Sequence, residues 1–473
     1  MQTFELEVCQ RLPLADSVFH LLDFCLEESF LDGIFDRYRG RSYEDILTFP
    51  QFVQVISDTL LARQRSAYQT FRNAHDAGTV PTCAEALYGK LRRVPLTLSQ
   101  GLLGEATDRL CQVFPNATDP LPSSLDGLEV FAFDGKKIKF VAKRLKLLRP
   151  LRGQILGGKL LVAQHMATGL AVALEADPDG EASDNSLVAG AVAQVRKRTT
   201  GKSRLWVGDR LFCDLQQIPV LRADGDHYLL RYQSKTHFHP DTTRTAQRGI
   251  DSRGVAYTEE WGWLGAPSHP GRQYVRRITL HRKNAEAIIL VTDLLDATVY
   301  PASDLLETYL RRWGIEKLFQ RVTEVFDLRH LIGSTPQATV FQAAFCFLLS
   351  NVIQTVRGYI AESQKCNPKT ISTELLFADI VEELTAWQKF LSLDETLEWL
   401  GTAVKTPEQV MAYIRKCLAG IWQKRWRKAT AKKPPKEKPP THYLKGGHSS
   451  VYRILRGEHE LSTDPAQVNP STC

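Results

Sequence analysis

A regular order of strand and helix patterns between residues 128 and 232 constrains the fold of this 473-residue chain more than any other feature. Three strand patterns come first, and each is a short apolar run bounded by turn-forming residues. A helical pattern, a fourth strand, a second helix and a fifth strand follow. The patterns cover 128–133, 159–165, 170–175, 185–195, 204–208, 213–222 and 227–232. Strands that alternate with helices in this way predict an α/β fold.

The three consecutive strands at the start of this series narrow the choice of fold further. A three-stranded meander followed by alternating helices and strands is the order of a ribonuclease-H-like sheet. We therefore predict a ribonuclease-H-like catalytic domain over residues 126–355. Loops rich in Gly, Pro and Arg, with further strand patterns between them, interrupt it from about 235 to 290, which predicts an inserted β-rich subdomain.

Helical patterns flank this domain on both sides. Apolar residues recur at three- and four-residue spacing in residues 1–125 and 356–422, which predicts helical N- and C-terminal regions. The last segment, 423–473, starts differently. Its residues up to 440 include eight Lys or Arg, four prolines and one acid, a composition that predicts an unfolded basic arm.

The composition restricts the class of protein. Hydrophobic residues make up 43% and charged residues 24%, as in a soluble globular protein, and the net charge is only +7. No two of the nine cysteines form a CxxC pair, which argues against a zinc-knuckle or redox motif. The N-terminus has no secretory signal pattern, and polar residues interrupt the apolar window 338–356. We expect a cytoplasmic protein that does not span a membrane.

Three acidic residues are placed for chemistry on this fold. Asp134 and Asp209 each follow an apolar strand pattern, and the ends of adjacent strands can bring their side chains together. Glu316 shares one face of a predicted helix with Tyr309 and Arg312, because their spacing matches the helical repeat. Converging carboxylates bind the two divalent ions, Mg²⁺ or Mn²⁺, that cleave phosphodiesters. We predict that the three acids are catalytic metal ligands in an enzyme that acts on DNA.

The helix that carries Glu316 is expected to be one continuous element over residues 303–326, with Ser303 as its N-cap. Its residues resemble a known family. Tyr309, Arg312 and Glu316 match the signature of the bacterial insertion-sequence DDE transposases in the group with conserved Tyr, Arg, Glu and Lys (insertion sequence family four type). The Lys of that signature falls at position 323, where this chain has Thr323.

The resemblance covers residues 128–355 and includes Asp134 in Phe-Asp-Gly and Asp209 in Gly-Asp-Arg. It implies cut-and-paste movement of a DNA element, in which strand cleavage at the terminal repeats precedes strand transfer into a target. It also implies a homodimer in a synaptic complex with double-stranded DNA. In such an enzyme Tyr309 and Arg312 would hold a phosphate beside the metals, a role that suits a guanidinium and a phenol.

Further cations near these acids are predicted to bind DNA phosphates. Lys136 and Lys137 begin a stretch, 136–152, that contains eight Lys or Arg and no acid. Lys317 and Arg210 are additional candidates, because each directly follows one of the predicted catalytic residues.

Two weaker patterns have alternative interpretations. Residues 82–93 and 98–110 fit either a DNA-binding helix-turn-helix or packed structural helices. Trp261 and Trp263 lie on one face of an inserted strand, where they would either form a small core or stack on a flipped base.

Two other functions are compatible with the same residues. The first is a ribonuclease-H-like nuclease that cuts DNA without strand transfer. The second is a transposase-derived DNA-binding protein that no longer cuts, which Thr323 in place of the signature Lys leaves open. Incubation with Mg²⁺ and DNA that carries the terminal repeats would separate these functions by cutting and joining, cutting alone, or binding alone.

Overall fold

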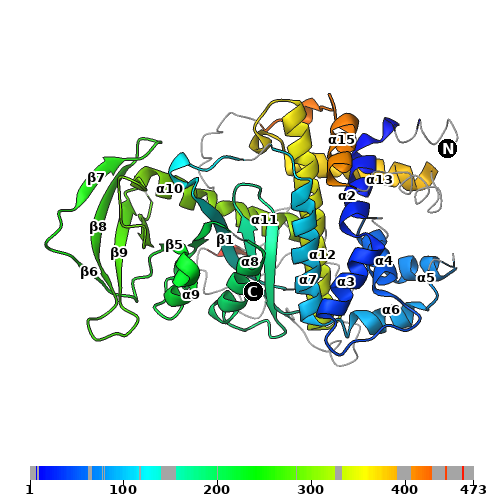
Figure 1. Cartoon of the computed structure of the whole chain (residues 1–473), viewed down its shortest axis with the longest axis horizontal. Coiled ribbons are helices and arrows are strands. Elements are labelled where there is room, and N and C mark those ends of the chain that lie inside the picture. Colours follow the sequence, from blue (N-terminus) through cyan, green and yellow to red (C-terminus); the bar gives the residue numbers. More distant parts are fainter. Residues whose placement is uncertain are drawn as a thin grey trace.

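The computed structural model shows a mixed α/β protein with a sheet at one end and a helical assembly at the other (Figure 1). It describes residues 7, 10–61, 67–76, 78, 80–116, 119–139, 156–199, 201–283, 285–324, 333–390, 406–428, 443–444 and 461–462. Most of the basic stretch 136–152 and most of the Pro-rich arm lie outside these described residues.

One mixed sheet of ten described strands forms the framework, in the order β3-β2-β1-β4-β5-β10-β9-β8-β6, with β7 paired to β8. Strands β1, β2 and β3 form an antiparallel meander, while β4 and β5 continue from β1 in parallel. The elements of this part are β1 (Leu128–Lys137), β2 (Lys159–His165), β3 (Ala171–Asp177), α8 (Asp184–Arg198), β4 (Ser203–Gly208), α9 (Ile218–Arg222) and β5 (His227–Arg231). Their order along the chain is the one predicted from the sequence, and it is consistent with a ribonuclease-H-like domain.

Burial on both faces explains why these strands appear as continuous apolar runs in the sequence. Val130 and Ala132 of β1 face one side of the sheet, where Val130 packs with Leu205 of β4. Phe131 and Phe133 face the other side, where α8 covers the sheet.

Strand β1 is longer than the sequence pattern predicts. It continues past Asp134 to Lys137, because β2 pairs with it along this length and places Val162 opposite Asp134 and Lys159 opposite Lys137. The expectation that β1 ends at residue 133 is therefore wrong. Asp134 lies within a paired strand, which restricts its backbone more than a turn would.

The residues expected to form a β-rich insertion are rich in strands, but these strands extend the same sheet. They are β6 (Phe238–Pro240), β7 (Gln247–Ile250), β8 (Ala256–Leu264) and β9 (Gln273–Leu280), followed by β10 (Ile288–Thr292). Strand β10 pairs directly with β5, so that Leu290 lies opposite Arg231. Figure 1 shows β6 to β9 at the end of the molecule farthest from the N-terminal helices.

The segment expected as one helix over residues 303–326 is two helices. They are α10 (Ala302–Arg311) and α11 (Trp313–Glu324), and α10 has Pro301 rather than Ser303 at its N-cap. At the break the Arg312 amide donates to the Tyr309 carbonyl and the Ile315 amide to the Arg312 carbonyl, both at 3.0 Å. These three-residue turns tighten the chain, and Gly314, a poor helix former, follows immediately.

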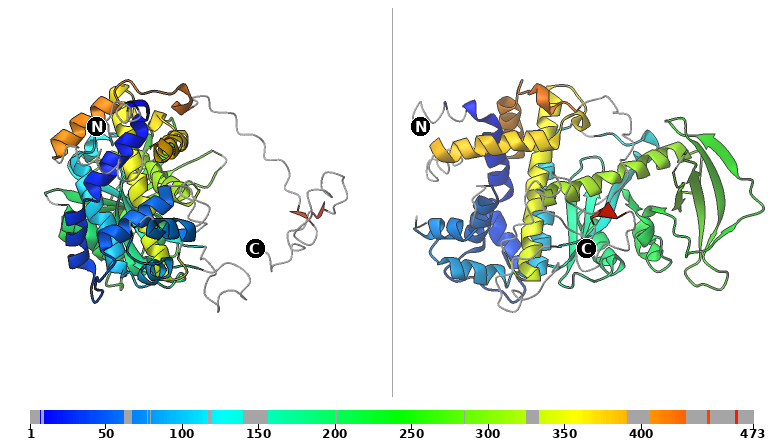
Figure 2. Two further views of the ribbon diagram at one scale, coloured as in Figure 1. Left: turned by 90° about the vertical axis from the view of Figure 1, so that its right-hand side faces the viewer. Right: turned by 180° about the vertical axis from the view of Figure 1, so that it is seen from behind.

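The N- and C-terminal helices pack together into one helical layer. Figures 1 and 2 show α12 standing between this layer and the sheet. The helices are α2 (Pro13–Cys25), α3 (Glu28–Tyr38), α4 (Phe49–Leu61), α5 (Ala67–Asp76), α6 (Ala84–Leu91), α7 (Leu96–Gln112), α12 (Pro336–Ser363), α13 (Thr373–Phe390) and α15 (Pro407–Cys417). Among the described helices, α12 alone is long and apolar enough to cross a membrane, and its apolar window is completely buried in the protein.

The candidate helix-turn-helix corresponds to α6 and α7, and α7 is a packed structural helix. It lies against α12 and β3, and its buried side chains include Leu102, Leu103 and Leu110. The amide nitrogen of Asn351 on α12 donates to the Thr107 hydroxyl at 2.9 Å. A helix held in this way is not free to enter a DNA groove, so the structural interpretation is the correct one for α7.

The start of the basic arm is folded, contrary to expectation. Lys424–Trp426 forms a short 3₁₀ helix in which Trp426 is buried. The Trp426 indole Nε1 donates to Oδ2 of Asp379 on α13 at 2.6 Å, and the Lys428 amide donates to the Thr370 carbonyl at 2.8 Å. A buried aromatic ring therefore anchors residues 423–428. Beyond them, the structure describes only the strand pair β11 (Tyr443–Leu444) and β12 (Leu461–Ser462).

Candidate active site

The pairing register of two parallel strands brings the two predicted aspartates together. Leu128 of β1 lies opposite Ser203 of β4, and Ala132 lies opposite Val207. Asp134 and Asp209 each come two residues after the last of these pairs, Asp134 within β1 and Asp209 directly after the end of β4. The charge of Asp209 raises the pKa of Asp134, so the two carboxylates lie near each other.

Each aspartate is oriented by a hydrogen bond from the backbone. Oδ1 of Asp134 accepts from the Gly135 amide at 2.9 Å, and Oδ1 of Asp209 accepts from the Arg210 amide at 2.7 Å. Asp209 is the N-cap of a short 3₁₀ helix (Arg210–Phe212) that begins directly after β4. In each case one oxygen fixes the carboxylate, so the other oxygen can face the site.

Arg312 connects the third acid to the sheet. Its Nη2 donates to Oε1 of Glu316 at 2.9 Å, and its Nη1 lies 4.0 Å from Oδ2 of Asp134. The guanidinium carbon lies 5.5 Å from the centre of the Tyr309 ring. Because Arg312 occupies the break between α10 and α11, its buried side chain points along the face that carries all these partners. The structure therefore groups Tyr309, Arg312 and Glu316 beside Asp134.

The guanidinium of Arg312 has unused hydrogen-bonding capacity. It is only 6% exposed, and among the described residues its Nε and Nη1 find no hydrogen-bond acceptor. Buried donors without acceptors are costly, so such groups in native proteins usually have a partner or a ligand. A phosphate oxygen would supply the missing acceptor.

The pKa of Asp134 reflects its burial and its charged neighbours. Burial raises the pKa of Asp134 from its ordinary value of 3.8 to about 6, although Arg312 and the Gly135 amide act in the opposite direction. The negative charges of Glu316 and Asp209 raise it further. Burial also raises the pKa of the Tyr309 phenol. The positive charge of Arg312 therefore does not fully compensate for the cost of burying the Asp134 carboxylate.

This arrangement suits a hard divalent cation, although the residues are not preassembled around one. Among the described residues, no three His, Cys, Asp or Glu side chains come close enough together to hold a metal. Arg312 instead provides the positive charge between Asp134 and Glu316. The donors are all carboxylate oxygens, which Mg²⁺ and Mn²⁺ prefer. The uncompensated charge of Asp134 is the feature that such an ion would satisfy.

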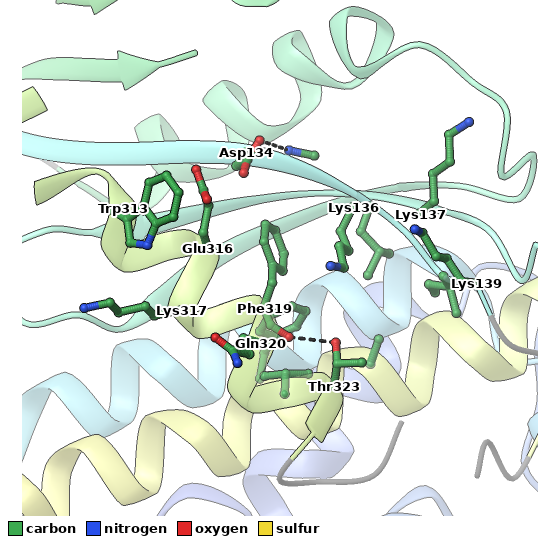
Figure 3. Close-up of a pocket in the computed structure, with 16 residues that line it drawn as sticks. Asp134, Lys136, Lys137, Lys139, Trp313, Glu316, Lys317, Phe319, Gln320 and Thr323 are labelled. Carbon is green, nitrogen blue, oxygen red and sulfur yellow. Dashed lines mark hydrogen bonds between the residues drawn. The ribbon is translucent and has the colours of Figure 1, made fainter. Parts of the chain in front are cut away.

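A cavity of about 600 Å³, here called the carboxylate cavity, opens beside Asp134 and Glu316 (Figure 3). Its other lining residues are Gly135, Lys136, Lys137, Ile138, Lys139, Leu160, Trp313, Lys317, Phe319, Gln320, Val322, Thr323, Ala343 and Phe347. In Figure 3, Trp313 and Lys317 lie to one side of Glu316, while Lys136 and Lys139 lie to the other. Cations therefore border both sides of the two acids.

The predicted DNA-binding cations have different positions relative to this cavity. The Lys136 ammonium lies 5.7 Å from the centre of the Phe319 ring, whereas Lys137 extends away from Asp134 (Figure 3). Lys317 lines the cavity from α11. Arg210 is exposed next to Asp209 and does not line the cavity. Its side chain instead lies 3.9 Å from the carboxylate of Glu286.

Thr323, at the position of the signature Lys, lines the carboxylate cavity. The Thr323 hydroxyl donates to the Phe319 carbonyl at 2.7 Å, so its hydrogen-bond donor has a partner within α11. Trp313, which was not among the residues predicted from the sequence, is 59% exposed and lines this cavity. The sequence could have indicated it, because Trp313 is a large aromatic residue next to Arg312 that lies outside the apolar face of its helix.

The two inserted tryptophans have separate environments. Trp261 is buried, and its Nε1 donates to the Leu295 carbonyl at 3.0 Å. Trp263 is 39% exposed and packs against Tyr274 and the guanidinium of Arg272. The core interpretation therefore holds for Trp261 alone.

Comparisons with known proteins agree with this geometry. Residues 128–352 match the family described as "Transposase DDE domain", and Asp134, Asp209 and Glu316 all lie within the match. No curated protein is significantly similar to the chain. Among solved structures, a piggyBac transposase in a synaptic complex with hairpin DNA matches over 84% of each chain, with 11% identity and a TM-score of 0.35. A likeness that distant supports no detailed comparison.

Proposed function

We propose that this chain is a DDE transposase, of the bacterial insertion-sequence group with the Tyr-Arg-Glu-Lys signature, and that it cleaves and joins DNA at the ends of its own element. The catalytic acids in this proposal are Asp134, Asp209 and Glu316. The observation that carries it is that Asp134 and Asp209 lie two residues beyond the last paired residues of the parallel strands β1 and β4, with the Arg312–Glu316 pair next to Asp134 within the matched domain.

Two Mg²⁺ or Mn²⁺ ions bound by these carboxylates would activate water or a 3′-hydroxyl and stabilise the leaving oxygen. The remaining work belongs to side chains of this chain. The free N–H groups of Arg312 bind the phosphate to be cut, and the Tyr309 hydroxyl donates a further hydrogen bond. Oε2 of Glu316 would hold a metal while Oε1 accepts from Arg312. The guanidinium thus balances the charge of Glu316 and keeps that carboxylate oriented.

Lys136 and Lys317 extend this phosphate contact along the DNA strand on either side of Glu316, and Lys137 and Arg210 add outer contacts. The strands β6 to β9 act as an inserted subdomain in this proposal. The direct pairing of β5 with β10 supports it, because the residues that form β6 to β9 lie between these two strands in the chain and extend the sheet beyond β10. Double-stranded transposon ends and target DNA are the substrates, a synaptic homodimer is the active assembly, and the cytoplasm is its location.

A strand-cleavage assay tests the proposal. Labelled DNA that carries the terminal repeats of the element is incubated with the protein and Mg²⁺, and Glu316→Gln serves as the inactive control. We expect nicks at the repeat ends followed by joined products, both absent with the control. Nicks without joined products would favour a plain nuclease, and binding without nicks would favour a DNA-binding protein derived from a transposase.

A further inference from the structure

A second cavity, of about 510 Å³, lies beside the carboxylate cavity along α11, and we call it the basic cavity. Six cations line it, and only two carboxylates do. The cations are Arg311, Lys317, Arg321, Arg357, Lys369 and Lys428, and the carboxylates are Asp119 and Glu374. Trp313 and Lys317 line both cavities, so that the two sites are neighbours along α11.

The two acids do not balance this positive charge. Asp119 forms ion pairs with Arg311 and Lys369, which are the cations nearest to it. Glu374 accepts a hydrogen bond from the Ser372 hydroxyl and is the carboxylate that faces the cations that remain. Glu374 acts on Arg321, Arg357 and Lys428, and Asp119 acts on Arg357 as well, so the cations of this cavity still outnumber the acids.

Buried donors that face the basic cavity have no acceptor. The Nε of Arg357 is buried and, among the described residues, forms no hydrogen bond. Gln354, only 3% exposed, lines the same cavity with neither end of its side-chain amide hydrogen-bonded in the described structure. An anion with several oxygens would satisfy these donors together, whereas an apolar ligand would leave them unpaired.

The surrounding groups also favour negative charge. Arg321 and Arg357 both direct Nη1 to one acceptor, the hydroxyl of Thr373, at 3.3 and 2.9 Å. Thr373 starts the long helix α13, whose N-terminus adds positive partial charge. Burial lowers the pKa of Arg357 to about 10, and the neighbouring Arg321 lowers it further. Burial and nearby cations likewise lower the pKa of Lys428.

We propose that the basic cavity binds a backbone phosphate of the DNA strand that runs on from the carboxylate cavity. The inference rests on the proposed function, which identifies the bound strand as DNA. The excess of cations and the unpaired donors favour an anion whether or not the protein cleaves DNA. Trp313 and Lys317 line both cavities, so one DNA strand can pass from the carboxylate cavity to the basic cavity along α11. In this arrangement the docked segment around Trp426 delivers Lys428 to the phosphate. The C-terminal residues thereby complete a DNA-binding site built mainly from α11, α12 and α13.

A binding experiment without cleavage tests this proposal. The full-length protein is titrated with labelled double-stranded DNA in EDTA over a range of salt concentrations. Lys428→Ala and Arg321→Ala remove cavity cations, and Lys424→Ala is the matched control. Lys424 and Lys428 are both exposed lysines of one short segment, but only Lys428 lines the cavity. We expect Lys428→Ala to weaken binding about tenfold and to reduce the salt slope by about 0.9, with Lys424→Ala close to wild type.

Thermal melting with inorganic phosphate distinguishes the source of the anion. If Lys428→Ala and Lys424→Ala bind DNA equally with equal salt slopes, the proposal is wrong. If phosphate raises the melting temperature of the wild type while the cavity variants bind DNA normally, a free anion occupies the cavity and the DNA assignment is overturned. Because Lys428 is exposed, its replacement leaves the fold intact. Absence of strand cleavage together with the expected binding difference would refute the proposed function but not this inference.

Discussion

Arg312, the residue between α10 and α11, donates a hydrogen bond of 2.9 Å to Glu316. A continuous helix would also place these residues one turn apart. The buried guanidinium of Arg312 also lies 4.0 Å from Oδ2 of Asp134 on the sheet. This relationship ties a helix residue to a strand residue through one cation, and it underlies the predictions about cleavage.

Replacing any one of the three acids should abolish cleavage and preserve DNA binding. Asp134→Asn, Asp209→Asn and Glu316→Gln each remove one negative metal ligand, while the many phosphate contacts that determine affinity remain. We expect no detectable nicking in Mg²⁺ and a dissociation constant within a few-fold of wild type. A variant that still nicks at near the wild-type rate would remove its residue from the site.

Arg312→Ala should slow cleavage by about 10²–10³-fold, because the buried guanidinium positions the phosphate and stabilises charge in the transition state. Arg312→Lys is the matched variant, since it retains the charge but loses the planar fork, and it should recover only part of the rate. Single-turnover nicking rates at saturating DNA measure the effect. Equal rates for Arg312→Ala and wild type would show that the residue serves only the fold.

Thr323→Lys should leave cleavage unchanged or make it faster. The side chain of Thr323 lines the carboxylate cavity and bonds only to its own helix, so a longer side chain has space to enter the cavity and contact DNA. Nicking rates and melting temperature are measured together. Loss of both would show that residue 323 packs against protein, and that the signature does not extend beyond Glu316 in this chain.

Glu383 provides a pH-dependent test of how the terminal helices dock. Its Oε2 accepts from the Leu14 amide at 2.7 Å and the Ala15 amide at 3.1 Å, which joins α13 to α2. Burial, helped by the charges of Asp379 and Asp16, raises the pKa of Glu383 from 4.5 to about 7, although the Ala15 and Leu14 amides act in the opposite direction. The protonated form is therefore favoured in the folded state. The stability that it contributes is complete below pH 4.5 and is lost as the pH rises through about 7.

Glu383→Gln should accordingly stabilise the protein at pH 8 by about 1–3 kcal/mol and have a much smaller effect at pH 4.5. Urea unfolding at the two pH values measures the difference. A gain of equal size at both pH values would show that the titration of Glu383 does not contribute to stability.

Two truncations separate the docked and undocked parts of the basic arm. Deleting residues 429–440 removes four Lys and one acid without disturbing Trp426. It should weaken binding to all DNA sequences alike and flatten the salt dependence. Deleting residues 423–440 also removes the buried indole, and it should lower the free energy of unfolding by about 3–5 kcal/mol. An unchanged salt slope after the shorter deletion would show that these lysines do not contact DNA.

Much of the fold follows from local patterns in the sequence. The strand and helix order from residue 128 to 232 was predictable because each buried strand is a continuous apolar run. Ser183 is the N-cap of α8, and its hydroxyl accepts from the Asn185 amide at 3.3 Å, as is typical of a serine at this position. Asp134 and Asp209 stood out because polar residues follow directly after such runs. The role of all three acids stays a prediction until it is tested.

Other features depend on contacts between distant segments, which no local pattern contains. Pairing with β2 extends β1 beyond Asp134, and packing of Trp426 against α13 folds residues expected to be disordered. The break at Arg312 had a local sign in Gly314, but the helical periodicity runs through it without interruption.

The sequence by itself determined the identity and spacing of the candidate acids and the order of the elements that carry them, because both depend on neighbours a few residues away. Only the tertiary structure decided that Arg312 stands between Asp134 and Glu316. It also decided that cations from α11, α12 and the C-terminal segment surround one basic cavity. The physical reason is that charges act through space, so that Arg321, Arg357 and Lys428 form a site only after the fold brings them together.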